Sequence, residues 1–300
     1  MKVATGLNIQ KGVKLSEHCR FSVGGPADFF IEVTSAEEIR DAIQYAKQNK
    51  LNYFVYSGGS NLFFDDKGFR GLVIRITGGK FKLLSDGLVL VDAGYELPKL
   101  VRDLASKGCG GLEFLGNIPG SVGGAVVGNA GCYGKSIADI LQTARVYHAG
   151  KNKVEVWKPE DFKFDYRYSV IKNDSDKIVL NATIKTVQRP PKEIVAELER
   201  ELDERMNKHP HTAKCAGSFF KNPEAMPAWK ATQEAGLQAF CVGGACLSDK
   251  HANFLINRGN ATSEDILNLA RKIQAVVKNK LNIKLEPEVR YVGEHGLEDI

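Results

Sequence analysis

The stretch that decides the fold is Gly111–Gly134, with the sequence GLEFLGNIPGSVGGAVVGNAGCYG. It lies in a dense glycine cluster, because ten of the chain's 30 glycines fall between Gly108 and Gly134. Glycine costs backbone entropy on folding, so such a cluster indicates tight turns or a backbone that approaches a ligand. Successive backbone N–H groups can form a concave site for an anion such as a pyrophosphate. Glycine packing at a sheet edge is the alternative.

Known phosphate-binding loops do not fit this stretch. The chain contains no GxxxxGK[ST] motif, and no GxGxxG opens a helix after a strand, so neither a P-loop nor a Rossmann site is predicted. A second small polar turn, SGGSN at Ser57–Asn61, follows an apolar strand-like run. Taken alone, this second turn is an ordinary loop.

Composition excludes several classes of protein. The 300 residues are 43% hydrophobic and 26% charged, typical of a globular chain. No run approaches the ~18 apolar residues that span a bilayer, and the N-terminus lacks the apolar core of an export signal. A cytoplasmic protein without a membrane partner is therefore expected. The net charge of +5 comes from interleaved basic and acidic residues, which argues against nucleic-acid binding.

The six cysteines form no CxxC pair and have no zinc-type spacing with histidine, so no metal site is predicted. Without an export signal, all six are expected to be reduced thiols. They are Cys19, Cys109, Cys132, Cys215, Cys241 and Cys246.

Residue patterns predict an α+β chain in three parts, 1–79, 80–190 and 191–300. In the first part, a capping box at Ser35 opens a helix among strands at 29–33, 53–56 and 72–76. The second part is β-rich, with one helix that starts at Pro98 and stops at Gly108 and with strands at 88–91, 144–148, 154–157 and 178–184. The pair Pro190-Pro191 marks the next boundary. Beyond it, apolar residues predict an amphipathic helix through Ile194, Val195, Leu198 and Leu202 and a final helix over 263–280.

Six motifs occur in the order of a known flavoenzyme family. They are SGGSNL at Ser57–Leu62, GLEFLGNIPGSVGGA at Gly111–Ala125, NAGCYG at Asn129–Gly134, YRYS at Tyr166–Ser169, GSFFKNP at Gly217–Pro223 and LEPEVR at Leu285–Arg290. The chain resembles the UDP-N-acetylenolpyruvoylglucosamine reductases from about residue 15 to residue 293. That family makes UDP-N-acetylmuramate for peptidoglycan.

The resemblance implies a fold and a branch of the family. Parts one and two together resemble the vanillyl-alcohol-oxidase-type (PCMH-like) FAD-binding domain, and part three a C-terminal α+β substrate-binding domain. Only 50 residues separate Arg167 from Ser218. This short spacing resembles the branch of the family that lacks an extra tyrosine-bearing loop over the substrate. A monomer is expected.

The resemblance also assigns a cofactor. FAD is expected to bind non-covalently, with NADPH as co-substrate, and Gly123 and Gly124 are expected to let the backbone approach the flavin. Cys132 lies near this loop but is not expected to tether the flavin. The residues carried over as cofactor-binding are Ser57, Gly58, Gly59, Ser60, Asn61, Gly120, Ser121, Gly123, Gly124 and Asn129.

Three residues match the family's catalytic positions. Arg167 is expected to hold the charge that develops on the substrate carboxylate, which a guanidinium suits. Ser218 is expected to donate the proton, and Glu288 to assist in polarising the enol. The UDP-sugar substrate is expected to meet Lys221, Asn222, His251 and Arg290.

Three positions depart from the family pattern. Cys19-Arg-Phe21 stands where a threonine pair usually precedes phenylalanine, Ser57 replaces the first glycine of its turn, and Ala239 replaces a glycine after Gly236-Leu. The serine at position 57 matters most for the conformation of its turn, since glycine at such a position often permits a positive φ.

Other functions are less well supported. Ser218-Phe-Phe-Lys221 also spells the SxxK of penicillin-binding proteins, but SDN and KTG are missing from the chain. Another FAD-dependent oxidase or dehydrogenase of the same domain class would not need GSFFKNP or LEPEV. A catalytically silent nucleotide-sugar binding protein would not need all three catalytic residues.

Overall fold

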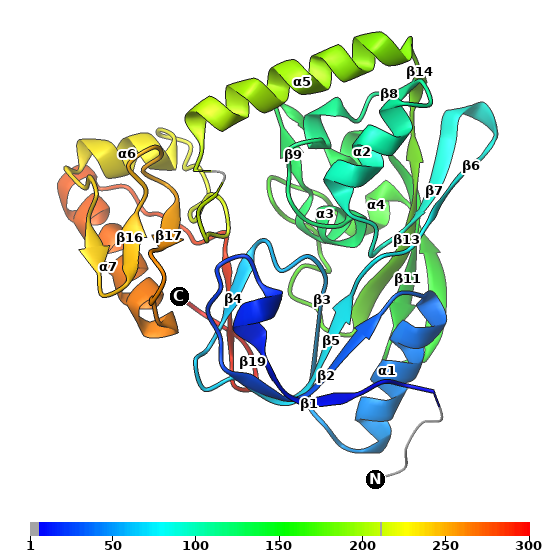
Figure 1. The fold of residues 1–300 in the computed structure, drawn as a ribbon, viewed down its shortest axis with the longest axis horizontal. Coiled ribbons are helices and arrows are strands. Elements are labelled where there is room, and N and C mark those ends of the chain that lie inside the picture. Colours follow the sequence, from blue (N-terminus) through cyan, green and yellow to red (C-terminus); the bar gives the residue numbers. More distant parts are fainter. Residues whose placement is uncertain (1–5, 211) are drawn as a thin grey trace. The chain divides into compact units, whose positions relative to one another are not determined.

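A computed structural model describes residues 6–210 and 212–300 (Figure 1). These residues group into two compact units. The first comprises residues 30–58 and 72–205 with the described part of the first nine residues, and the second comprises 10–29, 59–71 and 206–300. Each unit therefore combines segments that are far apart in the sequence.

A four-stranded sheet has the order β1-β2-β5-β3. β3 and β5 run parallel, with Tyr53 opposite Leu72. The predicted strands at 29–33, 53–56 and 72–76 are confirmed, and two of them begin earlier than expected. The strands are β1 (Gln10–Lys14), β2 (Pro26–Val33), β3 (Tyr53–Tyr56) and β5 (Phe69–Ile76).

The first helix, α1 (Ala36–Gln48), begins at the predicted cap. The Ser35 hydroxyl accepts the N–H of Glu38 at 3.1 Å, and the Glu38 carboxylate accepts the N–H of Thr34 at 2.7 Å. These bonds satisfy donors that the helix itself leaves unpaired. The hydrogen bond from Thr34 holds the pKa of Glu38 below its usual value.

The first unit is built on a five-stranded antiparallel sheet of order β12-β11-β13-β7-β6. β13 is buried along nearly its whole length, because α3 packs against it and α1 also contacts it. All four strands predicted in this part are confirmed. The bounds are β6 (Phe81–Leu83), β7 (Leu88–Asp92), β11 (Leu141–His148), β12 (Lys153–Trp157) and β13 (Lys177–Lys185).

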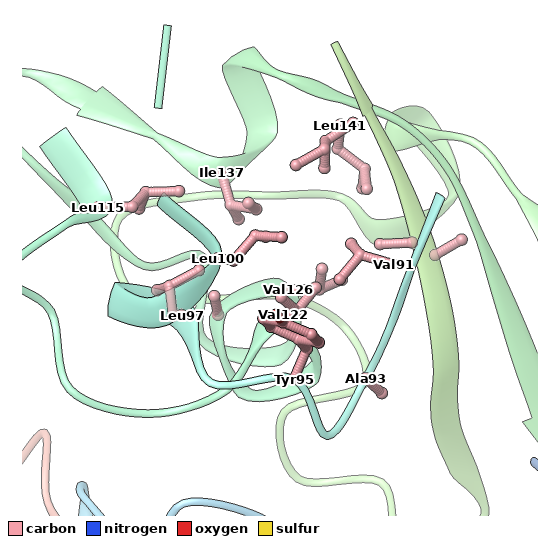
Figure 2. Close-up of a cluster of buried hydrophobic side chains, with 14 of the residues drawn as sticks. Val91, Ala93, Tyr95, Leu97, Leu100, Leu115, Val122, Val126, Ile137 and Leu141 are labelled. Atoms are coloured by element: carbon pink, nitrogen blue, oxygen red, sulfur yellow. The ribbon is translucent and has the colours of Figure 1, made fainter. Parts of the chain in front are cut away.

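A hydrophobic core joins this sheet to two helices, α2 (Leu97–Ala105) and α3 (Val122–Gly128). Figure 2 shows side chains of α2 and α3 gathered beside those of β7 and β11. Each large apolar side chain that is fully buried stabilises the fold by about 1.5–3 kcal/mol. The core thereby fixes α3, which is the helical part of the glycine-rich stretch. Its members include Val91, Leu97, Leu100, Leu115, Val122, Val126, Ile137 and Leu141.

Short elements complete the first unit. β8 (Cys109–Gly110) pairs with β14 (Val187–Gln188), and β9 (Gly131–Cys132) pairs with β10 (Lys135–Ser136). α4 spans Pro159–Phe162.

The helix α5 (Pro191–Lys208) begins at the second proline of the predicted boundary, a position that proline tolerates because no helical N–H is needed there. Its predicted apolar face is only partly covered, since Ile194 is buried but Val195 and Leu202 are 39% and 42% exposed. No helix in residues 6–210 and 212–300 has both the length and the apolar character needed to span a membrane.

The second unit holds two small three-stranded sheets and two helices. β18 (Arg290–Gly293) pairs in parallel with β4 (Leu62–Phe64) and antiparallel with β19 (Gly296–Glu298). The other sheet is a meander of β15 (Cys241–Val242), β16 (Ala245–Leu247) and β17 (Leu255–Asn257). α6 spans Ala228–Glu234, and α7 spans Ser263–Leu281, close to the predicted final helix.

The prediction that all six cysteines are reduced thiols is wrong for one pair. Cys241 and Cys246 form a disulfide. They lie opposite each other in the β15–β16 hairpin, whose two-residue turn is Gly243-Gly244. A tight hairpin places its flanking residues side by side, which brings the two sulfurs together. The other four cysteines are thiols: Cys19, Cys109, Cys132 and Cys215.

Candidate active site

The glycine-rich stretch forms a turn, a short helix and a left-handed end. Ser121 caps α3 by accepting the N–H of Gly124 on its hydroxyl at 3.2 Å. Asn129 ends the helix in the left-handed conformation, with φ of 45°. Its side-chain amide donates to the carbonyl of Asp165 at 2.9 Å and accepts the N–H of Ala138 at 3.3 Å. Asn129 therefore ties the end of α3 to the segment that carries Arg167.

The two glycine-rich turns meet backbone to backbone in the first unit. A Cβ on Gly58 would lie 2.9 Å from the Cα of Gly120, closer than real contacts allow. Gly120 itself has a φ of +137°, where side chains are strained. Glycine at both positions is thus required by the approach of the turns. The two facing turns are here called the glycine cradle.

The neighbouring glycines differ in what surrounds them. A Cβ on Gly123 would lie 2.8 Å from the Cβ of Ala93, so this glycine is needed for packing within the protein. A Cβ on Gly124 would meet only the Ser121 hydroxyl, at 3.4 Å, among atoms within 4 Å. Gly124 therefore leaves space beside the turn, and its role in cofactor binding stays a prediction.

Backbone donors in the stretch are partly used by the fold. The N–H of Val122 donates to the carbonyl of Tyr95 at 3.0 Å, and that of Gly123 to the carbonyl of Ala93 at 2.8 Å. With Gly124 donating to Ser121, three successive N–H groups are satisfied internally. A ligand in the cradle would therefore contact the turn residues before the helix rather than these donors.

The SGGSN turn is divided between the units after Gly58. In the first unit, the Ser57 hydroxyl donates to the carbonyl of Ile76 at 2.5 Å, and Ser57 does not have a positive φ. Serine in place of the family's glycine therefore causes no backbone strain at this position. In the second unit, Gly59 has a φ of +59°, and a Cβ there would lie 2.6 Å from the carbonyl oxygen of His18. Ser60 follows it and leads to Asn61.

Arg167 is held in an unusual backbone conformation. Its φ is +54°, within a turn closed by backbone hydrogen bonds between Asp165 and Tyr168. The guanidinium donates from Nη2 to the carbonyl of Gly131 at 2.6 Å and lies 5.2 Å from the ring centre of Tyr166. Such strained positions persist only where the surroundings impose them. The half-buried guanidinium is thus fixed against the glycine-rich stretch.

The Ser218 and Glu288 segments lie side by side in the second unit. The N–H of Glu288 donates to the carbonyl of Phe219 at 2.8 Å, and Phe220 forms a bridge with Pro287. Ser218 forms a second bridge with Phe254 on its other side. The structure therefore brings the predicted proton donor and the predicted glutamate to neighbouring strands. Both side chains are only partly buried.

Asn253 is a positioning residue that the sequence did not reveal. Its side chain is almost completely buried, accepting the N–H of Phe220 at 2.9 Å and donating to the carbonyl of the same residue at 2.8 Å. Its own carbonyl accepts the N–H of Phe219 at 2.7 Å. Asn253 therefore clamps the strand that carries Ser218. In the sequence it stands only two residues after His251, in Lys-His-Ala-Asn at 250–253.

Asn61 and Arg290 form a second link to Glu288. Asn61 donates from Nδ2 to the Glu288 carbonyl at 3.1 Å and accepts the backbone N–H of Arg290 at 3.0 Å. Burial lowers the pKa of Arg290 to about 10, so its side chain remains charged at neutral pH. Its buried Nε has no hydrogen-bond partner among the described residues. A buried cationic donor without a partner suits an anionic ligand.

The remaining predicted substrate residues lie in the same unit. Lys221 pairs with Glu286 at 3.5 Å, and Asn222 accepts the N–H of Ala228 at 3.0 Å on its side chain. His251 stacks on His209, with ring centres 5.1 Å apart. Burial, and then the charge of His209, lowers the pKa of His251 to about 4.

Cys132 lies beside Arg167's partner Gly131. Burial raises the pKa of its thiol, which keeps it protonated and a poor nucleophile. An apolar groove of about 260 Å³ between α2 and α5 contains none of the predicted site residues.

Comparisons with known proteins agree along the whole chain. The family described as "FAD binding domain" matches residues 27–154, and "UDP-N-acetylenolpyruvoylglucosamine reductase, C-terminal domain" matches residues 209–292. The reductase of Bacillus pumilus is 36% identical over 94% of this chain and 93% of its own, and that of Carboxydothermus hydrogenoformans is 39% identical over 93% and 92%.

Among solved structures, the UDP-N-acetylenolpyruvylglucosamine reductase of Thermus caldophilus has a TM-score of 0.81 at 35% identity. The match covers 95% of this chain and 99% of that one. These matches confirm the predicted fold class, an FAD-binding domain followed by a separate C-terminal domain.

Proposed function

The chain belongs to the UDP-N-acetylenolpyruvoylglucosamine reductase family, and from that premise we propose that it reduces UDP-N-acetylenolpyruvoylglucosamine to UDP-N-acetylmuramate with NADPH. The chain is an FAD-dependent oxidoreductase of this family.

The glycine cradle fits a flat cofactor with a pyrophosphate. Gly58 and Gly120 approach as only glycines can, and Gly124 leaves open space beside them. Bound FAD supplies hydride transfer between NADPH and the terminal carbon of the enolpyruvyl double bond. The residues proposed to hold it are the two turns, Ser57–Asn61 and Gly120–Ser121, with Gly124 leaving space beside them and Asn129 fixing the end of α3. No covalent tether is proposed, because Cys132 is kept protonated by burial.

Arg167 is proposed to stabilise the charge that develops on the substrate carboxylate. An enolate-like anion forms when hydride adds to the double bond, and a guanidinium binds a carboxylate with two parallel hydrogen bonds. The bond from Nη2 to Gly131 and the fixed turn hold this group in one place before the reaction. A pre-positioned charge needs no reorganisation as the transition state forms.

Ser218 is proposed to protonate the neighbouring carbon, with Glu288 assisting. A serine hydroxyl is a weak acid, but a carbanionic centre is basic enough to take its proton. The observation that carries this proposal is the hydrogen bond from the Glu288 N–H to Phe219, which sets the two residues on adjacent strands. Asn253 and Asn61 hold these strands from opposite sides.

Arg290 is proposed to bind the anionic part of the UDP-sugar. Its buried Nε lacks a hydrogen-bond partner among residues 6–210 and 212–300. We propose that three further residues also contact the UDP-sugar: Lys221, Asn222 and His251.

The test replaces Ser218 with Ala and follows the two half-reactions separately. Flavin reduction by NADPH should proceed at the wild-type rate, because Ser218 takes no part in it. Flavin reoxidation by the enolpyruvyl substrate should fall by about 10²–10⁴-fold, the usual contribution of a positioned acid. The exposed Ser106→Ala serves as the matched control. An equal loss in both half-reactions would contradict the proton-donor role.

A further inference from the structure

Trp229 is an exposed tryptophan that the packing of its helix does not require. It is the second residue of α6, and 41% of it is exposed. The buried face of α6 consists of Ala228, Ala231 and Thr232. The exposed indole offers a flat apolar face and one N–H donor to another molecule.

A hydrogen bond holds the backbone next to Trp229 against one of the proposed diphosphate contacts. The Asn222 side chain accepts the N–H of Ala228 at 3.0 Å, and Ala228 directly precedes Trp229. Consecutive Cα atoms are about 3.8 Å apart. Trp229 is therefore within one residue of the position where Asn222 and Lys221 are proposed to meet the diphosphate.

The neighbouring imidazole adds a donor to the surface. The ring centre of His251 lies 6.3 Å from that of Trp229, and Phe254 and His209 pack on its other sides at 4.8 and 5.1 Å. Its Nδ1 accepts the N–H of Asn253 at 3.3 Å, which assigns the remaining proton to Nε2. The site therefore combines two flat rings with one N–H donor, which matches a nucleobase that has two π faces and carbonyl oxygens.

We propose that Trp229 is the stacking surface for the uracil ring of the UDP-sugar, with His251 beside it. The inference rests on the proposed function, because it presumes a uridine nucleotide. In this proposal, separate residues bind the base and the diphosphate of the nucleotide. Lys221 and Asn222 bind the diphosphate, whereas Trp229 contributes only when a base is present.

The experiment measures binding of UDP and of inorganic pyrophosphate to the FAD-loaded protein by calorimetry. Stacking of a base on an aromatic ring accounts for a change of about 5- to 150-fold in affinity. Trp229→Ala should weaken UDP binding by that factor and leave pyrophosphate binding unchanged. Trp229→Phe, which keeps an aromatic face, should recover most of the loss. Leu297→Ala removes a similarly exposed apolar side chain of the same unit and should change neither ligand.

A second readout uses fluorescence. The chain has two tryptophans, so Trp157→Phe leaves Trp229 as the sole tryptophan emitter. UDP should quench this emission, and pyrophosphate should not.

Three results would overturn the inference. Trp229→Ala could bind UDP as tightly as the wild type, or it could lose UDP and pyrophosphate equally, which would indicate a structural role in α6. Wild-type protein that binds no UDP would contradict the proposed function itself, and the stacking with it.

Discussion

At the scale of single residues, the molecule places several non-glycine residues in the left-handed region. Arg167, with φ of +54°, has this strain at the centre of the proposed chemistry, and hydrogen bonds on both sides of it hold the turn. Ala239, with φ of 49°, has the same strain in a place where resemblance to the family calls for glycine. Ala239 is therefore a position where glycine would relieve strain without touching a proposed site residue.

Ala239→Gly should stabilise the protein. Left-handed backbone costs a residue with a Cβ about 1–2 kcal/mol, and the greater unfolded-state freedom of glycine offsets about 0.5–1 kcal/mol of the relief. The expected net gain in the free energy of unfolding is up to about 1 kcal/mol, measured from urea midpoints. Ala225→Gly, at an exposed position without a positive φ, should stabilise nothing. Equal effects of the two variants would contradict the assignment of strain.

At the scale of elements, the strand that carries Ser218 depends on contacts from distant segments. Phe219 and Phe220 bond to Asn253, and Lys221 bonds to the backbone of Glu286. These are isolated bridges rather than a regular sheet. The position of the segment that carries the proposed proton donor therefore depends on the clamp that Asn253 provides.

Asn253→Ala should cost about 2–4 kcal/mol of unfolding free energy. It leaves a buried N–H and a buried carbonyl of Phe220 without partners, and each such group costs about 1–3 kcal/mol. Chemical denaturation checks this value, with the exposed Asn260→Ala as control. A loss below about 1 kcal/mol would show that water or another group replaces the clamp.

The regular elements could be predicted from the sequence, whereas the site's supports could not. Capping at Ser35 and the apolar strands of the middle segment are local signals, and the structure confirms them. The Asn253 clamp and the parallel pairing of Arg290 with Leu62 join residues far apart in the chain, so no periodicity could indicate them. The Cys241–Cys246 disulfide was also not predicted, because the cysteines were expected to be reduced thiols, and the pairing depends on the β15–β16 hairpin that places them opposite each other.

Resemblance, rather than physical pattern, assigned the site residues. The glycine cluster indicated a place but not a ligand. The structure adds that Gly123 is required for packing on Ala93 and that Asn129 has both ends of its amide bonded within the protein. A sequence motif cannot indicate such internal roles, since it specifies which residues are present and not which atoms they contact.

At the scale of the whole molecule, His251 makes stability depend on pH. Its folded pKa of about 4 lies below the unfolded value near 6.5, mainly because burial disfavours the charged ring. Between these values the unfolded chain binds more protons, so stability is complete above pH 6.5 and falls as pH drops toward 4. His251→Gln should show a smaller fall over that window, measured by thermal unfolding. Identical pH profiles would contradict the depressed pKa.

The disulfide gives a second whole-molecule prediction. Unfolded protein that has not been reduced should react with a thiol reagent at four cysteines, and reduced protein at six. Cys241→Ser should leave Cys246 as a fifth reactive thiol. Six reactive thiols before reduction would show that the pair does not form.

The central claim is that this chain passes reducing equivalents from NADPH through FAD to an enolpyruvyl UDP-sugar. The most direct measurement reduces the protein-bound flavin with one equivalent of NADPH without oxygen and then adds UDP-N-acetylenolpyruvoylglucosamine. The yellow colour should be lost and then return, with one UDP-N-acetylmuramate formed per NADPH. A flavin that stays reduced in the presence of this substrate would contradict it.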